Sequence, residues 1–169
     1  MVACPGFIDI HTHSDFTLLI DGLAHSKIRQ GVTLEVTNNC GGWAAPLIGA
    51  SLDDARKQVE RYDPGLALDW QDMRGYLERP EQAGTAVNVA CLVGHGTVRM
   101  NVLGTASTPA SQDDLARMGD LIERAFAEGA TDVSYGLIYV PSLFANREEL
   151  NYVGRVVQRL GGSVVYHIR

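Results

Sequence analysis

The sequence lacks the features that mark membrane, secreted and nucleic-acid-binding proteins. No run approaches the ~18 consecutive apolar residues of a membrane span, so no membrane partner is expected. Met1 leads directly into a predicted strand, without the pattern of a signal peptide. The formal net charge is −6 over 169 residues, which argues against nucleic acid or an anionic membrane surface as the main partner.

Cysteine and lysine are also scarce. The three cysteines, Cys4, Cys40 and Cys91, form neither a CxxC motif nor a paired framework, which is typical of a reducing compartment. We therefore expect a cytoplasmic protein, in which a special cysteine acts as a ligand or nucleophile. The only lysines are Lys27 and Lys57, and both fall in predicted helices.

Apolar strands and amphipathic helices alternate along the chain, which is 46% hydrophobic and 20% charged. Strands are predicted over residues 5–15, 32–37, 86–93, 131–137 and 163–168. Helices are predicted over residues 24–30, 51–62, 70–78, 111–128 and 146–160. Most strands are apolar on both faces, which is typical of a parallel sheet covered by helices.

The fold class can be inferred from this order. No GxGxxG comes after the first strand, which weighs against a dinucleotide-binding sheet. Five strands are too few to close a (β/α)8 barrel, which typically takes ~250 residues. The sequence therefore predicts an α/β protein in which residues 1–169 form a single incomplete TIM-barrel domain, with about the first five β/α units.

Candidate metal ligands begin at the first strand. Side chains alternate along a strand, so His11 and His13 are expected to point the same way, together with Asp9. Two imidazoles one pleat apart can bind one metal ion from the same side. Taken alone, the pair could also be two partly exposed histidines on an ordinary strand.

Other polar residues lie just after the later strands, and the carboxyl ends of barrel strands form the active-site face. With His11 and His13, the side chains of Cys40 and His167 make an imidazole and thiolate set suited to Zn²⁺. Such a metal could support hydrolysis of an amide. Singly, Cys40 could be a small buried residue and His167 a hydrogen-bonded core histidine. His95, between two glycines, is expected near the site.

Several segments together resemble the N-acyl-D-amino-acid deacylase (D-aminoacylase) branch of the amidohydrolase superfamily. Pro-Gly-Phe-Ile-Asp-Ile-His-Thr-His at 5–13 is similar to the first-strand signature of the superfamily. Asn-Cys-Gly at 39–41 resembles the deacylase branch, in which a cysteine after strand two binds zinc. Segments 93–99, 136–141 and 166–169 are similar to that branch in the same order.

The resemblance implies a zinc-dependent hydrolase that converts an N-acyl-D-amino acid to a carboxylate and a D-amino acid. Cys40 and His167 would hold a tightly bound zinc ion, and His11 and His13 a weaker one, with Cys40 between the two. The family's remaining zinc-binding histidine and its proton-transferring aspartate are expected beyond Arg169, so no catalytic acid or base is assigned within the chain.

The same resemblance implies the substrate-binding residues. Tyr139 would lie against the acyl-amino acid or polarise its carbonyl. His95 and Arg99 match a family segment and are expected to contact the same small molecule.

Two alternatives remain. A hydantoinase-like or dihydroorotase-like cyclic amidase is disfavoured, because those branches favour a carbamylated lysine on strand four and segment 131–137 contains no lysine. A non-catalytic half-barrel is the other alternative. Its open sheet edges would favour self-association.

Overall fold

The computed structural model describes residues 3–168, in which short strands alternate with helices. The strands are β1 (Phe7–Asp9), β2 (Val32–Thr37), β3 (Asn88–Cys91), β4 (Val93–Gly94), β5 (Val133–Gly136) and β6 (Val164–His167). The helices are α1 (Thr17–Ile20), α2 (His25–Ile28), α3 (Ala50–Val59), α4 (Met73–Ala83), α5 (His95–Leu103), α6 (Gln112–Ala127) and α7 (Arg147–Leu160), with a 3₁₀ turn η1 (Ser142–Phe144).

All strand pairs are parallel, in two three-stranded sheets ordered β1-β2-β3 and β4-β5-β6. Leu92 alone separates β3 from β4, and its N–H donates to the carbonyl of Thr37 (3.2 Å). The next N–H, of Val93, donates to the carbonyl of Asp132 on the other side (2.8 Å). One extended segment therefore joins both sheets, so the chain forms the mixed α/β fold with parallel strands that the sequence predicted.

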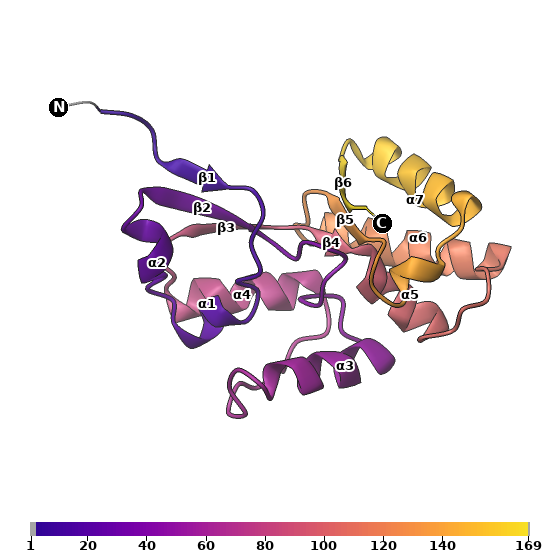
Figure 1. Ribbon diagram of the computed structural model, residues 1–169, viewed down its shortest axis with the longest axis horizontal. Coiled ribbons are helices and arrows are strands. Elements are labelled where there is room, and N and C mark those ends of the chain that lie inside the picture. The colour runs from indigo at the N-terminus through magenta and orange to yellow at the C-terminus, as the bar shows by residue number, and fades with distance from the viewer. Residues whose placement is uncertain (1–2, 169) are drawn as a thin grey trace.

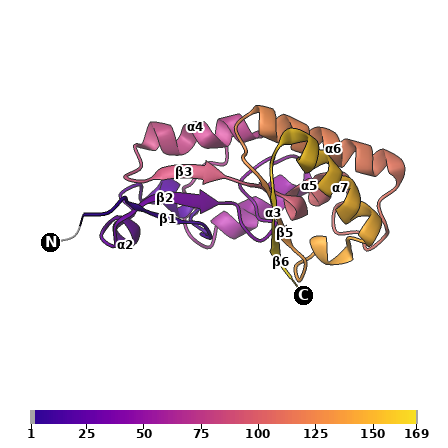
Figure 2. The same ribbon diagram turned by 90° about the horizontal axis from the view of Figure 1, so that it is seen from above.

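The helices pack in two groups along the strands. In Figure 1, α1, α2 and α4 accompany β1–β3, and α5, α6 and α7 accompany β4–β6. Figure 2 shows α4, α6 and α7 along one side of the strands. These helices contribute Met118 and Ile122 of α6 and Val153 and Val156 of α7 to the core, where all four are fully buried. The core continues to α3, whose Ala55 and Val59 belong to the same cluster. None of the helices described is long and apolar enough to cross a bilayer.

The two longest helices begin where the sequence predicted them, directly after Ser111 and Asn146. Ser111 accepts from the N–H of Asp114 and completes a capping box at α6. Asn146 accepts from the N–H of Glu149 at α7, and Gly161 ends that helix with a φ of 75°. Between these caps the apolar residues recur at helical spacing, so cap and pattern agree.

Two other helix boundaries differ from the prediction. α3 begins at Ala50, and the hydroxyl of Ser51 accepts from the N–H of Ile48 (3.0 Å) instead of capping the helix. α4 is capped by Asp72 and continues through Pro80, where the sequence predicted an end.

The first strand is shorter and more exposed than predicted. β1 covers only three residues, and the side chains of Phe7, Ile8 and Ile10 are 59%, 59% and 72% exposed. Among the described residues β1 pairs only with β2, so it is an edge strand. The prediction of a buried strand over residues 5–15 is wrong because burial depends on neighbours that apolar sequence alone does not specify.

Candidate metal centre

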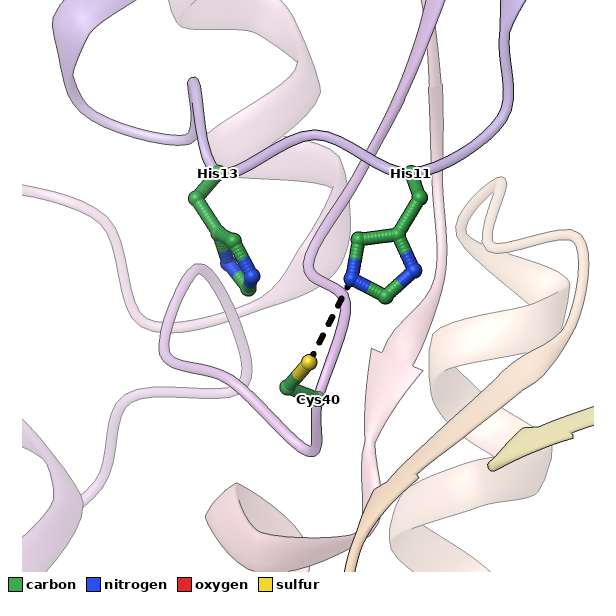
Figure 3. A group of neighbouring side chains, drawn as sticks. All are labelled: His11, His13 and Cys40. Atoms are coloured by element: carbon green, nitrogen blue, oxygen red, sulfur yellow. Dashed lines mark hydrogen bonds between the residues drawn. The ribbon is translucent and has the colours of Figure 1, made fainter. Parts of the chain in front are cut away.

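The predicted ligands of this chain converge on the sulfur of Cys40. Its Sγ lies 3.4 Å from Nε2 of His11 and 3.3 Å from Nδ1 of His167. The ligand atoms of His11, His13 and Cys40 all lie within 4.8 Å of one another, and Figure 3 shows both imidazoles pointing toward the cysteine. Tetrahedral zinc with bonds of about 2.0–2.3 Å places its ligand atoms roughly 3.6 Å apart. The spacing and the chemistry of these donors therefore fit such an ion.

Thr12 explains why the two neighbouring histidines face the same way although they lie beyond β1. Its side chain is buried, and its N–H and hydroxyl both donate to the carbonyl of Val36 (3.1 and 3.0 Å). Anchoring Thr12 inward leaves His11 and His13 on the opposite side of the backbone. Asp9 departs from the prediction, since its carboxylate pairs with Nζ of Lys27 (2.6 Å), which also lowers its pKa.

The loop after β2 turns sharply to present the thiol. Asn38 and Cys40 have φ angles of 62° and 56°, in the left-handed region that residues other than glycine rarely adopt. The buried side chain of Asn38 donates to the carbonyl of Leu92 (2.6 Å) and accepts from the N–H of Ala44 (3.1 Å). Ser134 donates to the carbonyl of Asn38 (2.6 Å). These buried bonds hold the turn in its unusual conformation.

Two strand-end glycines let this loop approach the sheet. A Cβ at Gly136 would overlap the carbonyl oxygen of Cys40, and one at Gly94 would overlap the carbonyl of Gly42. The position of Cys40 therefore depends on the absence of side chains at the ends of β4 and β5.

Burial and a nearby acid control the protonation of the sulfur. Burial, and then the charge of Asp15, raise the pKa of the Cys40 thiol. Asp15 accepts a short hydrogen bond from the N–H of Asn38, and burial raises its own pKa to about 6. Since a metal binds the thiolate, binding must displace the thiol proton, and affinity must fall in acid.

A cavity of about 380 Å³ opens beside the cysteine. Its lining includes His13, Cys40, Trp43, Tyr62 and Tyr139. The ring of Tyr139 also stands edge-on to that of His167, with 5.3 Å between centroids. The predicted substrate contact at Tyr139 therefore lies next to both the cavity and a candidate ligand.

His95 and Arg99 occupy a different environment. Both side chains are 0% exposed, on the first turns of α5, and neither lines the cavity. Each pairs with the buried carboxylate of Glu149, at 2.9 Å from His95 and 3.4 Å from Arg99. This burial runs against the prediction that they contact substrate, because their polar atoms already face protein partners.

Comparison with known proteins places the chain in a family. A sequence model described as "Amidohydrolase family" matches residues 1–168. The chain belongs to the amidohydrolase family. Over 169 residues it is 38% identical to the D-aminoacylase of Alcaligenes xylosoxydans xylosoxydans, covering 100% of this chain and 34% of that protein.

Solved structures agree with the sequence match. This amidohydrolase chain superposes with a TM-score of 0.82 and 39% identity on a D-aminoacylase studied for its binuclear metal centre, covering 95% of this chain and 33% of the other. It also matches N-acyl-D-glutamate deacylase from Bordetella bronchiseptica, crystallised with zinc and a phosphonate inhibitor, at a TM-score of 0.82 and 29% identity, covering 98% and 34%. The chain thus spans about a third of the length of these relatives and forms a partial amidohydrolase domain.

Sequence reasoning missed the residues that support the amidohydrolase site. Asn38 had a recognisable signal, because asparagine is the residue after glycine that best tolerates positive φ. Trp43 and Tyr62, which lie before and after α3, had none, because only tertiary packing brings them to the cavity. Segment 166–169 ends in Arg169, which lies outside the described residues.

Proposed function

We propose that this chain is the first part of the catalytic domain of a zinc-dependent deacylase that cleaves N-acyl-D-amino acids to a carboxylate and a D-amino acid. The observation that carries the proposal is the sulfur of Cys40, which contacts both His11, just after the first strand, and His167, at the end of the last strand. Cysteine and histidine together form a donor set that suits zinc. The 38% identity to a D-aminoacylase supports the choice of reaction.

Two groups of ligands share the cysteine in this proposal. Cys40 and His167 hold the tightly bound ion, and His11 and His13 hold the weaker one. When bound, zinc supplies a Lewis acid that polarises an amide carbonyl and acidifies water. Tyr139, edge-on to His167, contacts the acyl-amino acid and directs its hydroxyl to the carbonyl.

The fold supports the same reading at the level of the domain. When β3 and β4 are taken as the one extended segment that they form, five parallel strand segments succeed one another with helices between them, as in the first five units of a TIM barrel. Since the chain spans 34% of the D-aminoacylase, we infer that the remaining zinc-binding histidine and the proton-transferring aspartate belong to the other two thirds. Three cysteines that remain free support a cytoplasmic location.

The test uses the complete protein that contains this chain, purified with zinc. We expect hydrolysis of N-acetyl-D-amino acids and not of their L enantiomers, loss of the rate after chelation, and recovery when zinc is returned. Equal rates on both enantiomers, or activity only on a cyclic amide such as a hydantoin, would assign the protein to another reaction. N-Acetyl-D-methionine, D-aspartate and D-glutamate derivatives compared side by side define the preferred substrate.

A further inference from the structure

A buried charged cluster lies behind the loop that carries Tyr139. Glu149 is 1% exposed at the start of α7. One of its carboxylate oxygens is hydrogen-bonded to Nε2 of His95, and the other accepts from the guanidinium of Arg99. His95 and Arg99 are four residues apart on α5, so they project from the same side of that helix. All three side chains lie outside the cavity lining.

The cluster reaches forward to two consecutive residues of the loop. Nδ1 of His95 lies 2.9 Å from the hydroxyl of Ser142, and Nε of Arg99 donates to the carbonyl of Pro141 (3.1 Å). Both residues come soon after Tyr139 in sequence. The N–H of Leu143 also donates to the carbonyl of Tyr139 (2.8 Å). The buried side chains therefore fix the segment from which the tyrosine projects.

The hydrogen-bond directions give the link a defined geometry. Because a carboxylate only accepts, Nε2 of His95 carries the proton that faces Glu149. Burial lowers the pKa of His95, so the ring is neutral and Nδ1 accepts from the hydroxyl of Ser142. Every polar atom of the imidazole is thus used by the protein, which fixes both the ring and the loop.

We propose that His95 is a positioning residue, which acts through Ser142 to hold Tyr139 against His167 and the cavity. Glu149 and Arg99 fix His95 and Pro141 in turn. The inference rests on the proposed function of Tyr139. A buried ion pair often adds little net stability compared with apolar residues, but it specifies one arrangement of the groups that it joins.

Two matched substitutions separate positioning from stability. In His95→Gln, the side-chain amide can take the place of Nε2, so the bond to Glu149 is kept and the bond to Ser142 is lost. In His95→Asn, the shorter amide can take the place of Nδ1, so the bond to Ser142 is kept and the bond to Glu149 is lost. Since Glu149 is a buried charge, His95→Asn should be the less stable variant.

The proposal expects the opposite order in activity. In the complete zinc-loaded protein, His95→Gln should lower kcat by up to about 100-fold, as a small misplacement can, and His95→Asn by much less. In a Tyr139→Phe background, His95→Gln should cause little further loss. Both changes act through the hydroxyl of Tyr139, which the first removes and the second misplaces. Activity that tracks stability in both variants, or losses that multiply in the double variant, would overturn the proposal.

Hydrogen exchange tests the same link without substrate. We expect His95→Gln to accelerate exchange of the amides in residues 139–145, and His95→Asn to leave them near the wild-type rate. Ser142→Ala, which removes only the hydroxyl, should reproduce the effect of His95→Gln if either histidine variant folds poorly. Unchanged exchange in both His95→Gln and Ser142→Ala would refute the link. Inactive wild-type protein with the expected exchange pattern would refute the deacylase proposal alone.

Discussion

Histidines of two kinds lie at or just after the carboxyl ends of the strands. His11, His13 and His167 are exposed or half-buried around the sulfur of Cys40. His95 also lies directly after a strand, yet it is completely buried and bonded on both ring nitrogens. Only the first kind leaves ring nitrogens accessible to an ion.

The difference arises from the segment that succeeds each strand. After β1 and β2 the chain continues as loops, which leave side chains at the surface of the cavity. After β4 it turns directly into α5, which packs against α3, α6, β5 and η1. The position of a histidine at a strand end is therefore insufficient to identify a ligand, and the covering of the next element decides its role.

The largest expected effect, on both zinc content and activity, follows from removing the sulfur of Cys40. In the complete protein, Cys40→Ala is expected to abolish tight zinc binding and deacylase activity, because the proposed ion loses its thiolate. The double variant His11→Ala/His13→Ala should retain most of the tightly bound zinc, although its turnover falls. The measurement is zinc per chain after dialysis, together with the hydrolysis rate. Cys4→Ala, at an exposed thiol, is the control, and full zinc retention in Cys40→Ala would defeat the ligand assignment.

Breaking the buried cluster should reduce stability instead. Glu149→Ala leaves Arg99 and His95 without their buried carboxylate, and should lower the free energy of unfolding by about 3–5 kcal/mol. The matched control is Glu123→Ala, which removes an exposed partner of Arg159 at 2.9 Å and should cost at most about 1 kcal/mol. Urea unfolding compares the two. Similar losses in both variants would show that the buried carboxylate has no special role.

The convergence of the candidate ligands was predictable from sequence, because it needs only the order of elements. β2 covers residues 32–37 as predicted, and the carboxyl ends of parallel strands meet at one edge. Cys40 and His167 are 127 positions apart and still lie in contact. The alternation of strands and helices along the chain is enough to predict that Cys40 and His167 lie at the same edge.

The role of His95 was not predictable in the same way. Its partner Glu149 is 54 positions away, inside the helix predicted over residues 146–160, and no sequence motif links the two residues. α5 itself was missed because residues His95–Arg99 are all buried, so its first turns lack the division into an apolar buried face and a polar exposed face that marks an amphipathic helix. The exposed residues of β1 show the converse error, since apolar character was taken for burial.

The exposed edge of the sheet leads to a prediction about association. Phe7 and Ile10 are 59% and 72% exposed, beside an edge of β1 that pairs with no other strand within residues 3–168. The 169-residue chain should therefore self-associate at micromolar concentration. Phe7→Lys and Ile10→Lys should each weaken association by up to about 2 kcal/mol through lost apolar burial. Tyr62→Lys, at a 65% exposed side chain that follows α3 and belongs to no strand, is the control. Sedimentation equilibrium measures the effect, and a monomeric wild-type chain would contradict it.

The smallest expected effect concerns the protonation of His95. Burial holds its pKa below the ordinary value of 6.5, so below pH 6.5 the unfolded chain binds a proton that the folded chain resists. This contribution to stability is complete above that pH and is lost as the pH falls toward the folded pKa. Glu149 opposes the shift and Arg99 adds to it.

His95→Gln removes this titration while its amide can still bond to Glu149. Urea unfolding of both proteins from pH 7.5 to 5 should therefore show a steeper loss of stability in the wild type than in the variant. Groups that titrate elsewhere contribute equally to both curves. The difference between the two curves therefore isolates the contribution of the imidazole to stability. Parallel curves would mean that the buried ring accepts a proton as readily as an exposed one, and the contrast between the two kinds of histidine would then not extend to their protonation.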